Sequence, residues 1–155
     1  MHAQGPRRQH RRVLLRPGRL RQGTRGLGLS EPAPREVALA YLRAFSTGDP
    51  DEVAGLVTDD FVNEHTTELG SGCVGRAEYR RRLPGFLATF AGLAYEPEDV
   101  VAEDDRVVVA YRMTASHDGH PIDIRGVMRF RIAGDRVAHR IDYWDGMVFL
   151  RQTGG

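Results

Sequence analysis

The chain has 155 residues, a formal net charge of +1 and a single cysteine. This length suits one domain with a core that needs no disulfide, and a single cysteine excludes an intramolecular one, so we expect a cytoplasmic protein. No apolar run approaches the roughly 20 residues that cross a bilayer, so no membrane partner is expected.

Residues 1–30 carry eight arginines and no acidic residue. Because they bury little apolar surface, we predict a disordered Arg-rich extension before a folded domain over residues 31–155. A twin-arginine export signal, a transit peptide and a nucleic-acid-binding arm stay open as alternatives. No aromatic residue is interleaved for base stacking, which argues against a nucleic-acid partner. All basic residues are arginines, which have GC-rich codons, and this favours a bacterial source.

Three helical patterns open the folded part. The first begins at Pro34, because a proline at the first helical position gives up an amide hydrogen that would be unpaired anyway. The second begins after Asp49 as its N-cap and places Val57 on its apolar face. A short strand is expected over residues 61–66. The third helical pattern contains Pro84, which should kink or split it.

From residue 93 the hydrophobic period becomes two, and an Asp-Gly pair in the sequence HDGH is a typical hairpin signal. Helices followed by strands predict an α+β fold, with three N-terminal helices packed on one face of a strongly curved, mainly antiparallel sheet. A last helical turn, MVFLRQ, closes the chain. The expected strands are residues 93–103, 106–116, 121–133 and 136–145.

Charged residues within apolar strands indicate the candidate site. In the last expected strand, Arg140, Asp142 and Trp144 share one face, whereas Asp145 lies on the other and is predicted to cap the final helix. Arg112 lies in an apolar strand, and burying its charge without a partner is costly. We therefore predict an ion pair between Arg112 and Asp142, with either a catalytic or a structural role.

Histidines provide weaker signals. Asn63 and His65 end the short strand, where His65 could exchange protons near neutral pH or lie in a solvated turn. His117 and His120 flank the expected hairpin turn but lack a convincing third ligand, so no metal site is predicted.

Together these elements resemble the nuclear transport factor 2-like superfamily, specifically its SnoaL-like polyketide-cyclase branch. The resemblance covers residues 34–154, through the motifs YLRAFSTGDPDEVAGLVTDDFV, GRAEYRRRLPGF and RIAGDRVAHRIDYWDGMVFLRQTG. It implies a cone-shaped fold enclosing an apolar pocket, without metal or organic cofactor. It also implies that Asp142 is the general acid/base of an aldol ring closure. The cyclases add a histidine and a glutamine, whose positions correspond to Met128 and Gly126.

The epoxide-hydrolase branch of the superfamily is a second, less complete resemblance. Its arginine and one aspartate correspond to Arg112 and Asp142, but its other aspartate corresponds to Thr114. Its water-positioning tyrosine and asparagine correspond to Val62 and Glu64. An epoxide-hydrolase-like protein would therefore have an incomplete catalytic set, without the second carboxylate of the proton shuttle.

The first functional hypothesis is a cofactor-free cyclase or isomerase that binds a small oxygenated, polyketide-like molecule. The alternative is a non-catalytic ligand-binding or dimerisation module of the same fold. A homodimer would form through an exposed apolar sheet face made by Val107, Val109, Tyr111 and Met113. The candidate catalytic residues are Asp142 and Arg112, and the candidate substrate-binding residues are Asn63, His65, Arg140 and Trp144.

Overall fold

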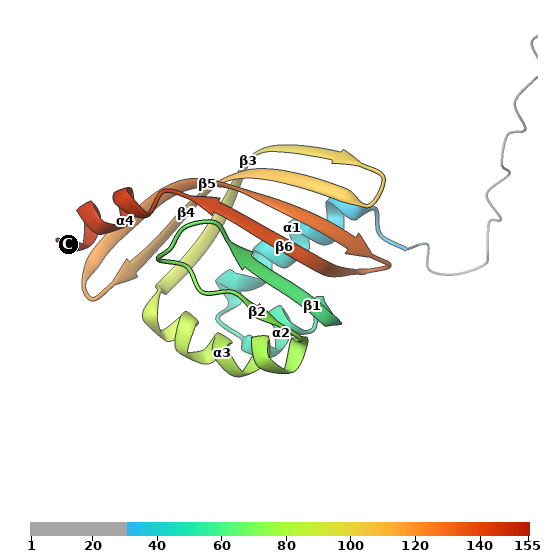
Figure 1. Ribbon diagram of the computed structural model, residues 1–155, viewed down its shortest axis with the longest axis horizontal. Coiled ribbons are helices and arrows are strands. Elements are labelled where there is room, and N and C mark those ends of the chain that lie inside the picture. Colours follow the sequence, from blue (N-terminus) through green and yellow to red (C-terminus); the bar gives the residue numbers. More distant parts are fainter. Residues whose placement is uncertain (1–30) are drawn as a thin grey trace, which may run out of the picture. The chain divides into compact units, whose positions relative to one another are not determined.

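The computed structural model (Figure 1) describes residues 31–155, and the predicted extension over residues 1–30 lies outside these residues. Helices and strands follow the predicted order, which confirms the α+β class. The elements are α1 (Pro34–Ala44), the 3-10 helix η1 (Phe45–Thr47), α2 (Pro50–Ala54), β1 (Val57–His65), β2 (Cys73–Val74), α3 (Arg76–Thr89), β3 (Ala91–Glu103), β4 (Arg106–His117), β5 (His120–Ala133), β6 (Arg136–Trp144) and α4 (Gly146–Thr153).

Helix ends follow the local signals of the sequence. Pro34 is the first residue of α1, and the Asp49 side chain accepts a hydrogen bond from the Asp51 amide at the start of α2. Asp145 caps α4 in the same way, through the Met147 amide at 2.9 Å. These caps satisfy amide groups that have no partner inside a helix, and they confirm the predicted starts.

Two helix predictions need correction. Val57 was expected on α2, but it begins β1 and lies opposite Val137 of β6. Strand pairing therefore overrides a helical pattern of only a few residues. Pro84 was expected to kink or split α3, yet the helix continues from Arg76 to Thr89 around it. Pro84 is exposed, so water can solvate the carbonyl group that loses its amide partner.

The sheet has six strands in the order β2-β1-β6-β5-β4-β3. β1 pairs with β6 in parallel, and every other neighbouring pair is antiparallel. Figure 1 shows the helices α1, α2 and α3 on the concave side of the curved sheet. Their apolar faces and the inward-facing side chains of the sheet form the core, which includes Tyr41, Phe45, Val107, Val109 and Phe130.

The predicted apolar dimer face is wrong. Val107 and Val109 are fully buried and Tyr111 is 2% exposed, because this side of β4 packs against the helices. The alternation was predicted correctly, but its inner and outer sides were exchanged. On the outer side of β4, Val108 and Arg112 reach solvent.

Among the described residues, no helix has the length and apolar character needed to cross a membrane.

Candidate functional site

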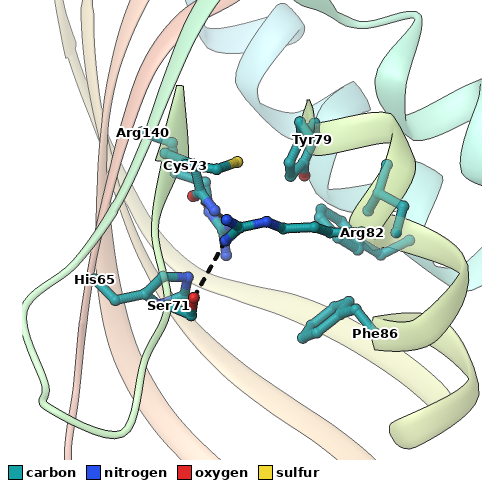
Figure 2. Close-up of a pocket in the computed structure, with 10 residues that line it drawn as sticks. His65, Ser71, Cys73, Tyr79, Arg82, Phe86 and Arg140 are labelled. Atoms are coloured by element: carbon teal, nitrogen blue, oxygen red, sulfur yellow. Dashed lines mark hydrogen bonds between the residues drawn. The ribbon is translucent and has the colours of Figure 1, made fainter. Parts of the chain in front are cut away.

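A pocket of about 80 Å³ lies between α3 and the inner face of β1 and β6 (Figure 2). Its apolar wall comes from Phe45, Leu83 and Phe86. Its polar wall comes from side chains on three different elements, and no aspartate or glutamate of the described residues lines it. The polar and charged side chains used below are Asn63, His65, Arg82 and Arg140.

The parallel pairing of β1 with β6 brings two distant motifs together. Asn63 lies beside Arg140 in this pairing, and His65 lies beside Asp142. Residues two positions apart in a strand face the same side, so all four side chains lie on the inner face of the sheet. The structure thus gathers four of the six predicted site residues, and Trp144 joins them through a hydrogen bond described below.

Arg140 and Asp142 form a buried ion pair at the inner end of the pocket. Each is 3% exposed, and Nη2 of Arg140 lies 3.1 Å from Oδ2 of Asp142. The Tyr111 hydroxyl donates to Oδ1 of Asp142 at 2.6 Å, and Nη1 of Arg140 donates to the side-chain oxygen Oδ1 of Asn63 at 3.1 Å. Buried charges are tolerated when they are paired and hydrogen-bonded in this way.

Burial dominates the electrostatics of the Asp142 carboxyl. Removal from water disfavours its charged form and raises its pKa, while the Arg140 guanidinium and the Tyr111 hydrogen bond act in the opposite direction. The pKa of Arg140 is well above its ordinary value, because the surrounding phenols and Asp142 outweigh the effect of burial. Arg140 therefore stays charged, and the pKa of the Asp142 carboxyl beside it is raised.

The predicted pair of Arg112 with Asp142 is wrong. Arg112 lies on the outer face of the sheet, where its guanidinium binds both carboxylate oxygens of Asp123, with Nε 2.8 Å from Oδ1. Its neighbour Tyr111 faces inward instead and reaches Asp142. Arg112 is therefore outside the site, and the epoxide-hydrolase pattern loses its arginine at this position as well as its second aspartate.

His65 is held in one neutral form by its neighbours. The Trp144 indole N–H donates to its Nδ1 at 3.1 Å, so the neutral ring carries its proton on Nε2. Burial, together with the positive charge of Arg140, lowers the pKa of His65 from 6.5 to about 4. His65 is consequently an uncharged hydrogen-bond donor at neutral pH, although its Nδ1 lies only 3.8 Å from Oδ2 of Asp142.

This pKa shift predicts acid sensitivity of the fold. The unfolded chain binds the His65 proton more tightly than the folded protein does, so protonation favours unfolding. The free energy of unfolding should be highest above pH 6.5, fall between pH 6.5 and about 4, and then level off. The His65 shift accounts for a total decrease of about 3 kcal/mol. Urea unfolding at pH 6.5 and pH 4 measures this loss. His65→Gln should remove most of the difference, and an unchanged pH dependence in that variant would contradict the assignment.

Aromatic residues of the helical layer also enclose the ion pair. The hydroxyl groups of Tyr41 and Tyr79 are hydrogen-bonded to each other, and the Arg140 guanidinium lies 5.9 Å from the Tyr41 ring centre and 5.8 Å from that of Phe45. Such distances allow cation–π attraction. Helical spacing alone cannot distinguish these rings from ordinary core residues, which is why their role was missed.

Met128 and Gly126 are the positions at which the resemblance to the cyclases implies a histidine and a glutamine. The Met128 sulfur accepts from Nε of Arg140 at 3.3 Å. A Cβ atom added to Gly126 would lie 2.4 Å from the Tyr111 hydroxyl oxygen. The Tyr111 side chain therefore occupies the space that a larger residue at position 126 would need.

In the part of the chain that the structure describes, no group of three or more histidine, cysteine, aspartate or glutamate side chains is arranged to hold a metal ion.

Comparisons with known proteins agree with this architecture. A family model described as a SnoaL-like domain matches residues 38–140. A search of curated proteins found no match. The structural matches below are all under 25% identical and concern the fold alone.

The first solved structure is a Catenulispora acidiphila protein with a ketosteroid isomerase-like fold, in complex with trimethylamine, with a TM-score of 0.71 and 17% identity over 77% of this chain and 92% of that chain. The second is a proposed SnoaL-like polyketide cyclase of Shewanella putrefaciens, with a TM-score of 0.71 and 15% identity over 81% and 98%. The third is an epoxide hydrolase of M. tuberculosis, with a TM-score of 0.67 and 18% identity over 78% and 92%.

Proposed function

This chain belongs to the SnoaL-like domain family, and we propose that it binds a small oxygenated organic molecule in its pocket and moves a proton on that molecule by general acid/base catalysis. The reaction is of the cyclase or isomerase kind and needs no metal or organic cofactor. The family membership and the names of structural neighbours, which include a proposed polyketide cyclase and an epoxide hydrolase, support this class of chemistry.

One observation carries the proposal: the carboxyl group of Asp142 is buried one side chain behind the pocket wall, and burial raises its pKa. A carboxylate with a raised pKa is a better base toward carbon acids than a solvated one. Its immediate neighbours Arg140 and His65 both line the pocket. A proton taken from a ligand therefore has a buried acceptor close by.

Arg140 and Asp142 act together in this proposal. The Arg140 guanidinium now donates to Oδ2 of Asp142. A ligand oxygen that accepts this N–H instead would free Oδ2 to take a proton from the adjacent carbon of the ligand. Negative charge that then develops on the ligand oxygen is stabilised by Arg140, with the neutral His65 and the Asn63 amide as further donors.

Deuterium exchange tests this function without knowledge of the natural substrate. Cyclopentanone is a small ketone, and its α-hydrogens are replaced by deuterium when a base removes them in D₂O. We expect the purified protein to accelerate this exchange, followed by loss of the α-proton NMR signal, in proportion to protein concentration. Exchange at the rate of buffer alone would contradict the proposed catalysis.

A second candidate function is a non-catalytic ligand-binding or dimerisation module. It is favoured by the hydrogen bonds that occupy both oxygens of Asp142, from Tyr111 and from Arg140, so that the carboxylate does not itself line the pocket. In this case the ion pair only maintains the shape of the pocket. Ligand binding without acceleration of exchange would identify this function.

We also propose a bacterial, cytoplasmic setting. The exclusive use of arginine among the basic residues supports the first part, and the single cysteine is compatible with a reducing compartment.

A further inference from the structure

The polar side chains of the pocket can still donate hydrogen bonds to a ligand, whereas their acceptor atoms already accept hydrogen bonds from other side chains. The Asn63 carbonyl oxygen accepts from Arg140, and Nδ1 of His65 accepts from Trp144. Both oxygens of the nearby Asp142 accept from Tyr111 and Arg140. With these internal hydrogen bonds made, the amide, imidazole and guanidinium groups present mainly N–H to a ligand.

Asn63 is the clearest of these donors. Its side chain is fixed in orientation, because a guanidinium can only donate and must therefore face the carbonyl oxygen of the amide. Within residues 31–155 its Nδ2 group makes no hydrogen bond, although Asn63 is only 7% exposed and lines the pocket. Nδ2 is not among the fully enclosed polar atoms that lack a partner, so it is open to the pocket, where a ligand or water can accept from it.

His65 adds a second donor. Since Trp144 fixes its tautomer, Nε2 carries the proton, and that atom has no protein partner within the described residues. It is not among the fully enclosed polar atoms that lack a partner, so it is open to solvent or to the pocket. The neutral imidazole thus donates without carrying a charge at neutral pH.

The charged side chains that line the pocket also favour an anionic ligand. Arg82 extends from α3 across the pocket and donates to the Ser71 hydroxyl at 3.2 Å and to the Gly72 carbonyl at 2.8 Å, as Figure 2 shows for Ser71. Its carboxylate partner Glu78 is shared with Arg81, so one negative charge faces two positive ones. Two guanidinium groups line the pocket, and no carboxylate from residues 31–155 does.

We propose that the pocket selects a ligand bearing an oxyanion, either a carboxylate or the enolate of a carbonyl compound, and rejects amines. The oxyanion accepts from Asn63, His65 and Arg140, while the hydrocarbon part of the ligand contacts Phe45, Leu83 and Phe86. This inference rests on the proposed function of the pocket and specifies its substrate class. Charge-assisted hydrogen bonds are the strong ones, so an anion gains most from a donor-rich wall.

Two ions with the same hydrocarbon part and opposite charge provide the test. Isobutyrate and isopropylammonium share a branched three-carbon body, and each is titrated into the ¹⁵N-labelled protein at neutral pH. Asn63 is the only asparagine of the chain, and its side-chain amide signal is identified by its loss in Asn63→Asp. We expect isobutyrate to shift this signal saturably and to bind at least about tenfold more tightly than isopropylammonium.

Asn63→Asp is the matched variant, since it keeps the size of the side chain, replaces the N–H donor by an acceptor and adds a negative charge beside Arg140. It should weaken isobutyrate binding by about tenfold or more. Equal or tighter binding of isopropylammonium, binding of neither ion, or unchanged isobutyrate binding in the variant overturns the inference.

The cyclopentanone assay separates this inference from the proposed function. Isobutyrate binding without ketone exchange leaves the oxyanion preference standing and rejects the catalysis. Ketone exchange without isobutyrate binding does the reverse, because a proton would then be moved in a pocket that has no preference for an anion.

Discussion

Asp142→Asn is expected to lower the rate of deuterium exchange into cyclopentanone by about 10²–10⁴-fold. Asparagine has the size of aspartate and can still accept a hydrogen bond from Tyr111, but Arg140 loses its carboxylate partner, so the comparison is made on folded protein. Its amide cannot take a proton from carbon at neutral pH, and the proposed base is therefore lost. The exchange rate is measured by NMR on wild type and variant at equal concentrations of folded protein.

Asp123→Asn is the matched control, because Asp123 carries the same carboxylate but pairs with Arg112 on the outer face of the sheet. Its exchange rate should equal that of wild type. NMR titration of the Asp142 carboxyl should in addition give a pKa above that of a free aspartate. Equal rates in all three proteins would show that exchange does not depend on Asp142, and a pKa at or below the ordinary value would remove the proposed base.

Much of the fold follows from local patterns in the sequence. The Asp-Gly hairpin signal forms the turn between β4 and β5, with positive φ angles of 49° at Asp118 and 78° at Gly119. What could not be predicted is the parallel pairing of β1 with β6, which joins segments about 80 residues apart in the chain. No local period encodes such a contact, since it arises from packing of the whole sheet.

The candidate site was likewise predictable only in part. The shared face of Arg140, Asp142 and Trp144 follows from strand alternation and is present in the structure. The partner of Asp142 was mistaken because alternation separates the two faces of β4 without stating which one meets the helices. Tyr111 faces inward with Val107 and Val109, so its neighbour Arg112 must face outward. The available signal for Tyr111 was that it shares one face of the strand with the apolar residues Val107, Val109 and Met113.

Arg140→Met is expected to reduce the free energy of unfolding by about 3–5 kcal/mol. Methionine has a similar length and fits the apolar surroundings of Tyr41, Phe45 and Met128. The loss arises because Asp142 stays buried without its positive partner, and an unpaired buried charge is more costly than an absent ion pair. Urea unfolding at pH 7, monitored by circular dichroism, gives the difference from wild type.

The double variant Arg140→Met/Asp142→Asn should be more stable than Arg140→Met alone, because a neutral amide at position 142 is less costly to bury than a carboxylate. Arg112→Met serves as the control for removal of an arginine from an exposed ion pair, and its effect should be much smaller. Two outcomes would contradict this: a loss of unfolding free energy in Arg140→Met as small as in Arg112→Met, or a double variant less stable than Arg140→Met. In either case Arg140 and Asp142 would not be the buried, interdependent pair on which the proposed acid/base chemistry depends.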